Sequence, residues 1–191
     1  MAPPRIEVAG GLYHVNGKAV HGAGLFRDDV DRLVFLDRLR DQARLSEWTV
    51  LSYSLMTTHY HLLLKLHKPT LSSGFRRLNS LYAKDYNRRH ARRGALWQRR
   101  FYDSLIESDE HLLEAIRYIA RNATRANAVN RPEEWPWCSY GSALGLLPKD
   151  PIVDEDELLA LFGARPDTAR AQLRAFVEEP DPRRRRGLTP V

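Results

Sequence analysis

Residues 59–66 place apolar side chains at every second position, the pattern of a β-strand with two different faces. One face carries Tyr60, Leu62, Leu64 and Leu66, and the other carries His59, His61, Leu63 and Lys65. The strand-like run 59–67 follows another, 48–56, with only Thr57 and Thr58 between them. These neighbouring strands favour a sheet whose apolar face is covered and whose histidine face is available for chemistry.

The other segments extend this pair into a longer series of strands and helices. Apolar periodicity predicts strands over 10–20 and 95–107 and helices over 28–44 and 108–122. It predicts a further helix that starts after Pro69, in a region that ends at Gly94. The resulting order is strand, helix, strand, strand, helix, strand, helix. This order predicts an α+β, ferredoxin-like (RRM-like) fold, in which helices back a four-stranded antiparallel sheet.

Two helices and one strand show which side chains should be buried. The helix after Pro69 has the clearer apolar stripe, formed by Leu71, Phe75, Leu78, Tyr82 and Tyr86. The helix over 28–44 has a looser stripe, formed by Val30, Leu33, Val34, Leu36 and Leu39. In the strand over 95–107, Trp97 and Phe101 are the expected anchors.

The domain boundaries follow a change in composition beyond Tyr140, where proline and glycine punctuate the chain. We expect one domain over 1–140, a helical extension over 141–179 and a disordered basic tail over 180–191. Cys138, the only cysteine, excludes an internal disulfide and a cysteine-built zinc site. Without a signal-like N-terminus or a long apolar run, the chain is expected to be cytoplasmic and to have no membrane partner.

Charge is concentrated in residues 72–101. The whole chain has a formal net charge of +6, but this segment holds nine basic residues against Asp85 alone, leaving 21 basic and 23 acidic residues elsewhere. Since a merely solvated helix usually mixes its signs, the segment predicts a face that binds a polyanion such as DNA. Its basic residues are Arg76, Arg77, Lys84, Arg88, Arg89, Arg92, Arg93, Arg99 and Arg100.

His59 and His61 point the same way along their strand and could reach one metal ion. On its own, a His-x-His pair is a weak signal, and it more often represents two half-exposed histidines that bind nothing. A third ligand is therefore needed to favour a metal site.

The helix over 108–122 offers such a ligand. Its apolar face consists of Leu112, Ala115, Ile116 and Ile119, and a neighbouring stripe consists of His111, Tyr118 and Asn122. An amide oxygen with two imidazoles would suit Mg²⁺ or Mn²⁺, provided that water and a phosphate oxygen complete the coordination. Alternatively, Tyr118 is a tyrosine at the edge of the core with no chemical role.

Four segments in the same order resemble the REP-associated tyrosine transposases of the HUH superfamily. They are YSLMTTHYHLLLKL (53–66), FRRLNSLYAKDYNRRHARRGALWQRRFYDSLI (75–106), RYIARNATRANAV (117–129) and EEWPWCSY (133–140). The resemblance implies that Tyr118 is the nucleophile and that His59, His61 and Asn122 hold the metal. It also implies single-stranded DNA with hairpin or palindromic elements as the partner.

The chain departs from the family pattern at three positions. Ala123 follows Asn122 where a proline is common, Asn127 stands where glycine is usual, and Cys138 stands where serine is common. Without that proline, the helix over 108–122 is free to run on past Asn122.

The resemblance implies transesterification, in which Tyr118 forms a 5′-phosphotyrosine and a 3′-hydroxyl later rejoins the strand. Two alternatives remain: a non-catalytic nucleic-acid-binding protein or repressor, and a metal-dependent hydrolase that uses water. Trp97, Trp135 and Trp137 could stack bases or serve as core anchors. The helix that carries Tyr118 could serve its own chain's histidines or those of a homodimer partner.

Overall fold

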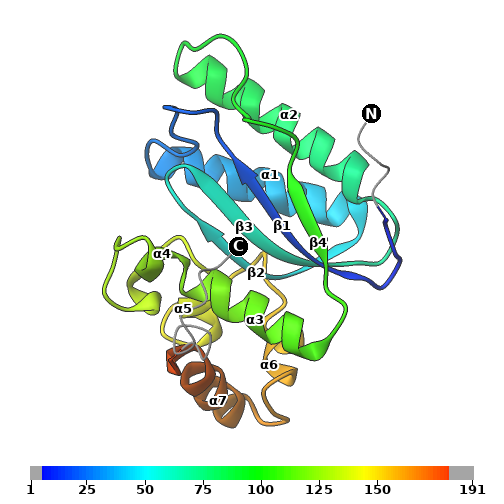
Figure 1. The fold of residues 1–191 in the computed structure, drawn as a ribbon, viewed down its shortest axis with the longest axis vertical. Coiled ribbons are helices and arrows are strands. Elements are labelled where there is room, and N and C mark those ends of the chain that lie inside the picture. Colours follow the sequence, from blue (N-terminus) through cyan, green and yellow to red (C-terminus); the bar gives the residue numbers. More distant parts are fainter. Residues whose placement is uncertain (1–5, 181–191) are drawn as a thin grey trace.

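The computed structural model describes residues 6–180, and its centre is one four-stranded antiparallel sheet in the order β2-β3-β1-β4. The strands are β1 (Leu12–Lys18), β2 (Trp48–Leu55), β3 (His59–Leu66) and β4 (Tyr102–Leu105). This sheet, with helices packed on it, confirms the predicted α+β class (Figure 1). Strands β3 and β1 are central, so side chains on them are flanked on both sides.

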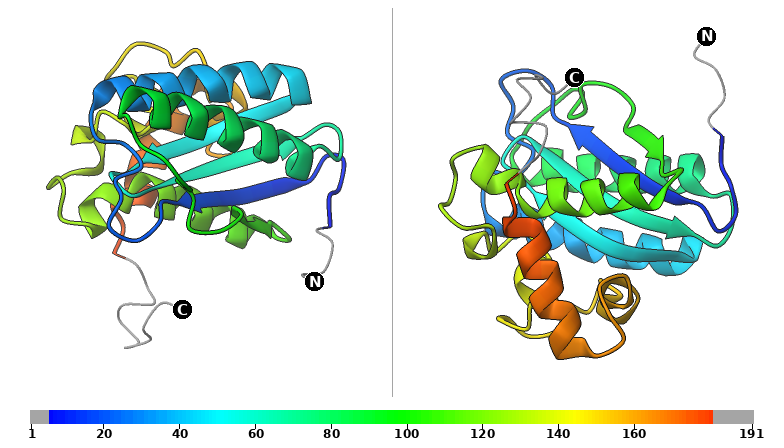
Figure 2. Two further views of the ribbon diagram at one scale, coloured as in Figure 1. Left: turned by 90° about the horizontal axis from the view of Figure 1, so that it is seen from above. Right: turned by 60° about the horizontal axis from the view of Figure 1, so that its bottom comes forward.

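Helices cover both faces of the sheet, as seen from above in the left view of Figure 2. One face is covered by α1 (Asp29–Ser46) and α2 (Leu71–Arg89). The other is crossed by α3 (Asp109–Ala120), which packs on β2 and β3. The remaining helices are α4 (Asn122–Arg125), a 3₁₀ turn (Pro132–Glu134), α5 (Tyr140–Ala143), α6 (Glu155–Ala160) and α7 (Pro166–Glu178).

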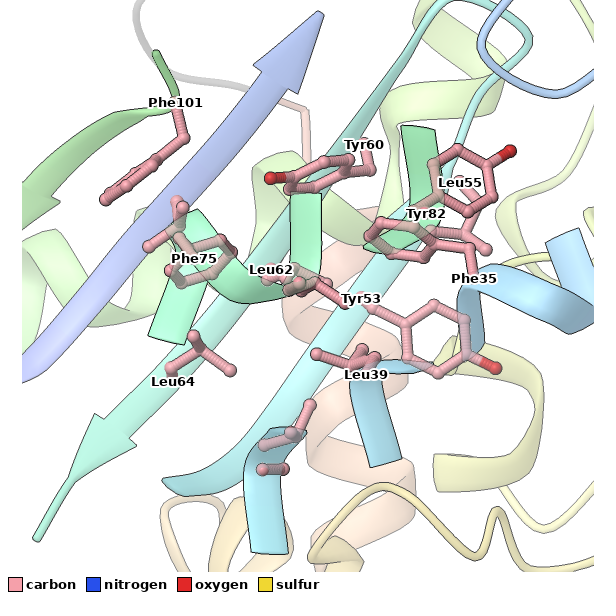
Figure 3. Packing of buried hydrophobic residues seen from close by; sticks show 14 of the residues in the cluster. Phe35, Leu39, Tyr53, Leu55, Tyr60, Leu62, Leu64, Phe75, Tyr82 and Phe101 are labelled. Carbon is pink, nitrogen blue, oxygen red and sulfur yellow. The ribbon is translucent and has the colours of Figure 1, made fainter. Parts of the chain in front are cut away.

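The core between the sheet and α2 confirms the predicted stripe, since all five of its side chains are buried. In Figure 3, Tyr60, Leu62 and Leu64 lie on one side of β3, beside Phe75 of α2. Gly74 allows α2 to pack closely, because a Cβ at this position would lie 2.3 Å from the Trp48 ring.

The apolar face predicted for α1 is partly wrong. Val30 and Leu33 are 48% and 54% exposed, whereas Phe35 and Leu39 are fully buried. The buried side of this helix also includes the polar residues Asp31, Arg32, Gln42 and Ser46. Hydrophobic periodicity misplaced the face because polar side chains with tertiary partners occupy part of it.

The last strand is shorter than the predicted range 95–107, because β4 pairs with β1 only over Tyr102–Leu105. Trp97 instead forms an isolated bridge with Ala19, beyond the end of β1. Phe101, one of the two predicted anchors, is 6% exposed in the core. The chain therefore leaves the edge of the sheet after Trp97 and rejoins it at Tyr102.

The predicted extension over 141–179 is helical and shares a core with the sheet. Leu51 and Leu63 from the strands belong to one buried cluster with the apolar residues of α3 and of α5 to α7. The expected boundary at 140 falls at the start of α5. The predicted basic tail, apart from Pro180, lies outside the described residues. Within residues 6–180, no helix combines the length and apolar character needed to cross a membrane.

Candidate active site

Strand β3 carries His59 and His61 on the face of the sheet that α3 crosses. Alternation along the strand places them with Leu63, which is buried in the core shared with α3. The two imidazole centroids are 5.2 Å apart in an edge-to-face arrangement. Both faces of β3 are therefore covered, and the histidines lie between the sheet and the helices beyond it.

Helix α3 brings Tyr118 to this pair within one chain. Ser108 caps the helix by accepting a hydrogen bond from the His111 backbone N–H at 3.2 Å, as the sequence predicts. The predicted apolar face of Leu112, Ala115, Ile116 and Ile119 is buried. Tyr118 flanks that face, and its ring centroid lies 5.0 Å from that of His61.

Asn122 meets His59 although no proline follows it. Helix α3 ends at Ala120, Arg121 lies between the helices, and Asn122 begins the short helix α4. The Asn122 side chain is 6% exposed, and its Oδ1 lies 3.2 Å from His59 Nε2. The resulting group of four, Tyr118, His59, His61 and Asn122, is complete in a single chain.

The distance of 3.2 Å between His59 Nε2 and Asn122 Oδ1 also fits two ligands of one metal ion. Bonds of about 2.1 Å to an octahedral ion such as Mg²⁺ place neighbouring donor atoms roughly 3 Å apart. Among residues 6–180, no three His, Cys, Asp or Glu side chains are arranged to hold a metal. The amide of Asn122 is thus the side chain that could complete a set of three donors with the histidine pair.

His14 is a site residue that the sequence reasoning missed. Strand β1 places it beside β3, with Nε2 2.9 Å from His61 Nδ1 and its ring centroid 5.7 Å from that of Tyr118. The alternation of β1 does separate His14 from the buried Tyr13 and Val15. Only the pairing of β1 with β3, however, reveals that its face is the histidine face.

Burial keeps all three histidines uncharged at neutral pH. It lowers the pKa of His14 to about 4, with a further contribution from His111. Burial also lowers the pKa of His61 well below 6.5, helped by the neighbouring imidazoles, and that of His59, where Asn122 partly opposes the effect. A neutral imidazole has the lone pair that a metal requires.

Two cations border the group of four. Lys18 is exposed and lies directly opposite His59 in the register of β1 and β3. The Arg125 guanidinium carbon lies 5.1 Å from the Tyr118 ring centroid. The sequence reasoning did not single out either residue, and both suit a site that receives a negatively charged phosphate.

The predicted DNA-binding residues lie elsewhere in the molecule. Five of the nine belong to α2 and the other four follow it, and α2 covers the face of the sheet opposite the histidines (Figure 2). Eight of the nine are exposed and Arg92 is half-buried. Arg89 is bound to Asp28 and Asp31, and Arg88 to Asp85, so these two guanidiniums already have acidic partners.

The three tryptophans considered for base stacking are half-buried and engaged with protein groups. Trp97 packs on Tyr60 and donates from Nε1 to the Asn79 backbone oxygen at 2.9 Å. Trp135 donates to the Leu55 oxygen at 3.2 Å, and Trp137 lies against the guanidinium of Arg32. These contacts favour the role of anchors.

The departures from the family pattern are accommodated by the fold. Asn127 has φ of 55°, a left-handed conformation that glycine adopts freely and that asparagine tolerates better than most residues. Cys138 is 3% exposed, and its backbone forms an isolated antiparallel β-bridge with Ser54 of β2. Ala123 is buried, and α3 ends before it without a proline.

Comparisons with known proteins give the fold and the family of the chain. A solved structure of a REP-associated tyrosine transposase bound to a REP hairpin superimposes with a TM-score of 0.67 over 81% of this chain and 93% of that one, at 17% identity. A Haemophilus influenzae protein assigned as a REP-associated tyrosine transposase is 35% identical over 54 residues, which span 28% of this chain and 31% of that protein. The family model described as "Transposase IS200 like" matches residues 18–122, more than half of the chain and the part that holds Tyr118, His59, His61 and Asn122. The chain therefore belongs to the IS200-like transposase family.

Proposed function

We propose that this protein is a metal-dependent transposase that cuts and rejoins single-stranded DNA through a covalent bond to Tyr118. The observation that carries the proposal is the meeting of Tyr118 with His59, His61 and Asn122 inside one chain. A site completed in this way needs no residue from a homodimer partner. A structural tyrosine would not require a metal-ligand set beside its ring.

His59, His61 and Asn122 are the ligands we propose for Mg²⁺ or Mn²⁺. Their donor set, two neutral imidazoles and an amide oxygen, suits these ions when water and phosphate oxygens complete the coordination. When bound, the ion supplies Lewis-acid polarisation of the scissile phosphate. The protein's part is to hold the three donors in place.

Tyr118 attacks the scissile phosphorus in the proposed reaction. The bond to the 3′-oxygen breaks, leaving a 3′-hydroxyl on one DNA end and a 5′-phosphotyrosine on the other. A 3′-hydroxyl from another end then attacks this linkage and releases Tyr118, so rejoining needs no ATP. The Arg125 guanidinium carbon, 5.1 Å from the Tyr118 ring centroid, puts positive charge where it can offset the charge of the phosphate.

The substrate we propose is single-stranded DNA that folds into a hairpin or contains a palindrome. The support is the similar solved structure, in which a REP-associated tyrosine transposase is bound to a REP hairpin. The exposed arginines of α2 and of residues 92–100 can contact backbone phosphates. We propose Arg76, Arg77, Lys84, Arg88, Arg89, Arg92, Arg93, Arg99 and Arg100 as this contact surface.

The test is a covalent-capture assay with Tyr118→Phe. Hairpin-forming single-stranded oligonucleotides, labelled on the strand expected to stay attached, are incubated with protein and Mg²⁺ or Mn²⁺ and separated under denaturing conditions. The proposal expects a labelled protein band from the unmodified chain. It expects no band from Tyr118→Phe, which should still bind the DNA. Tyr102→Phe, at a tyrosine of strand β4, is the matched control and should retain the band.

Two results would overturn the proposal in different directions. Unchanged cleavage by Tyr118→Phe would indicate a hydrolase that uses water. No cleavage by the unmodified chain with either ion, despite binding, would indicate a DNA-binding protein or repressor on the same fold.

A further inference from the structure

The ring of His14 packs beside both a proposed metal ligand, His61, and the proposed nucleophile, Tyr118. Its Nε2 is 2.9 Å from His61 Nδ1, and the two ring centroids are 5.1 Å apart. The Tyr118 ring centroid is 5.7 Å from that of His14 and 5.0 Å from that of His61, so the three rings form one cluster. His14 belongs to the central strand β1 and precedes residues 18–122, so it lies outside the part of the chain that the family model matches.

A bond between two neutral imidazoles allows only two arrangements of protons. In one, His61 Nδ1–H donates to His14 Nε2, and the lone pair of His61 lies on its own Nε2. In the other, His14 Nε2–H donates, and His61 carries its proton on Nε2. Only the first leaves His61 able to bind a metal through Nε2, because a protonated nitrogen has no free lone pair.

We infer that His14 is a positioning residue that accepts the Nδ1 proton of His61 and so directs His61 Nε2 toward the metal. The inference rests on the proposed function, since it takes His61 to be a metal ligand. His14 itself does not touch the metal or the DNA in this role. It fixes the tautomer and the ring orientation of a residue that does.

The surroundings of His59 and His61 support this inference. His59 also has its Nδ1 beside a side-chain partner, Thr58 Oγ1, at 3.1 Å, while its Nε2 faces Asn122. Each proposed histidine ligand thus has its Nδ1 within hydrogen-bond distance of another side chain. His61 is only 6% exposed, so water has little access to replace His14 as the acceptor.

The first test is a measurement on metal-free, DNA-free protein. Nitrogen NMR of the histidine rings reports which nitrogen carries the proton. We expect His61 to be in the Nδ1–H form in the unmodified chain and to change its tautomer distribution in His14→Phe, which keeps a ring but lacks the acceptor. His67, which pairs with Thr49 beyond the far end of β3, is the internal control and should not change.

The second test is the affinity for Mn²⁺ without DNA, measured by calorimetry or electron paramagnetic resonance. Loss of such an outer partner typically weakens metal binding about 10–100-fold, which is the drop expected for His14→Phe. His14→Gln retains an acceptor at a similar reach and should recover most of the affinity. A loss of affinity without any change at His61 would indicate a structural role and contradict the inference.

Other outcomes would also overturn it. Finding the His61 proton on Nε2 in the unmodified chain would contradict the inference by itself. This result does not depend on whether either variant folds. Equal Mn²⁺ affinity in His14→Phe and the unmodified chain is equally decisive. Failure of the proposed function would appear instead as loss of the Tyr118 adduct, which neither measurement uses.

Discussion

At the scale of single residues, the histidines at the site combine burial with a form suited to metal binding. Burial lowers the pKa of His14, His59 and His61, and a lowered pKa means that the imidazole stays neutral to more acidic pH. The same burial makes the folded protein sensitive to acid. The unfolded chain takes up these protons near pH 6.5, whereas the folded chain resists them until lower pH.

This difference predicts that the metal-free protein loses stability as the pH falls from 6.5 to 4. The pKa of His14 drops from 6.5 to about 4 on folding. At ~1.4 kcal/mol per pKa unit, His14 alone accounts for about 3 kcal/mol of unfolding free energy over this interval. Denaturant unfolding at several pH values measures the slope. His14→Phe should show a shallower slope, and identical slopes in the two proteins would count against the prediction.

At the scale of elements, α3 joins the sheet to the C-terminal helices through adjacent residues. Tyr118 faces the histidines, while the preceding Arg117 is 5% exposed and reaches α7. The Arg117 guanidinium carbon lies 3.9 Å from the Phe176 ring centroid, and its Nε donates to the Phe176 backbone oxygen at 3.2 Å. The C-terminal extension therefore supports the helix that carries the proposed nucleophile.

Arg117→Ala should destabilise the fold by about 2 kcal/mol, since it removes a buried cation–π contact and a charged hydrogen bond. Urea unfolding followed by circular dichroism measures the change. Arg121→Ala is the matched control, because Arg121 also bonds the extension, through the Glu179 backbone oxygen at 3.2 Å, but this bond is exposed. It should cost less than about 1 kcal/mol. Equal effects of the two substitutions would argue against a special role for Arg117.

At the scale of the whole molecule, the proposed DNA contacts and the proposed chemistry lie on opposite faces of the sheet. Helix α2 covers one face and α3 crosses the other (Figures 1 and 2). One edge of the sheet is occupied, because residues 137–139 bond to β2. DNA that contacts both α2 and Tyr118 is therefore expected to pass around the other edge, at β4.

Charge reversal on α2 should weaken DNA binding in a salt-dependent way. Arg76→Glu and Arg77→Glu should each lower the slope of log affinity against log salt by about one, the value for one lost phosphate contact. The measurement is a titration of labelled hairpin DNA at several salt concentrations. Arg165→Glu changes the net charge equally, at an exposed position next to α7, and should leave the slope nearly unchanged. If the three variants had the same slope, the result would indicate that the DNA-binding surface does not include α2.

Tyr102 offers a stacking platform along the expected path around β4. It is 55% exposed and lies opposite Asn16 of β1, on the same face as His14. Tyr102→Ala should weaken binding of single-stranded DNA by about 1–3 kcal/mol, the usual contribution of one stacked base. Tyr102→Phe keeps the ring and should bind as the unmodified chain does. Unchanged binding by Tyr102→Ala would indicate that the strand takes another path.

Local patterns in the sequence predicted the elements whose formation depends on near neighbours. The alternation over 59–66 placed His59 and His61 on one face, the stripe of α2 was buried as predicted, and Ser108 began α3. The first two features follow from repeats of two and about 3.6 residues, and the third follows from the capping chemistry of serine; the chain displays all three without any tertiary contact. The fold class followed from the order of these elements.

Tertiary structure alone decided the contacts that join distant segments. The pairing of β1 with β3 brought His14 to His61, 47 positions away, and no local pattern specifies that register. The end of α3 at Ala120 brought Asn122 to His59 without the proline. Polar partners determined which side of α1 is buried. The free energy of such contacts depends on both partners. The sequence of one segment alone therefore cannot predict them.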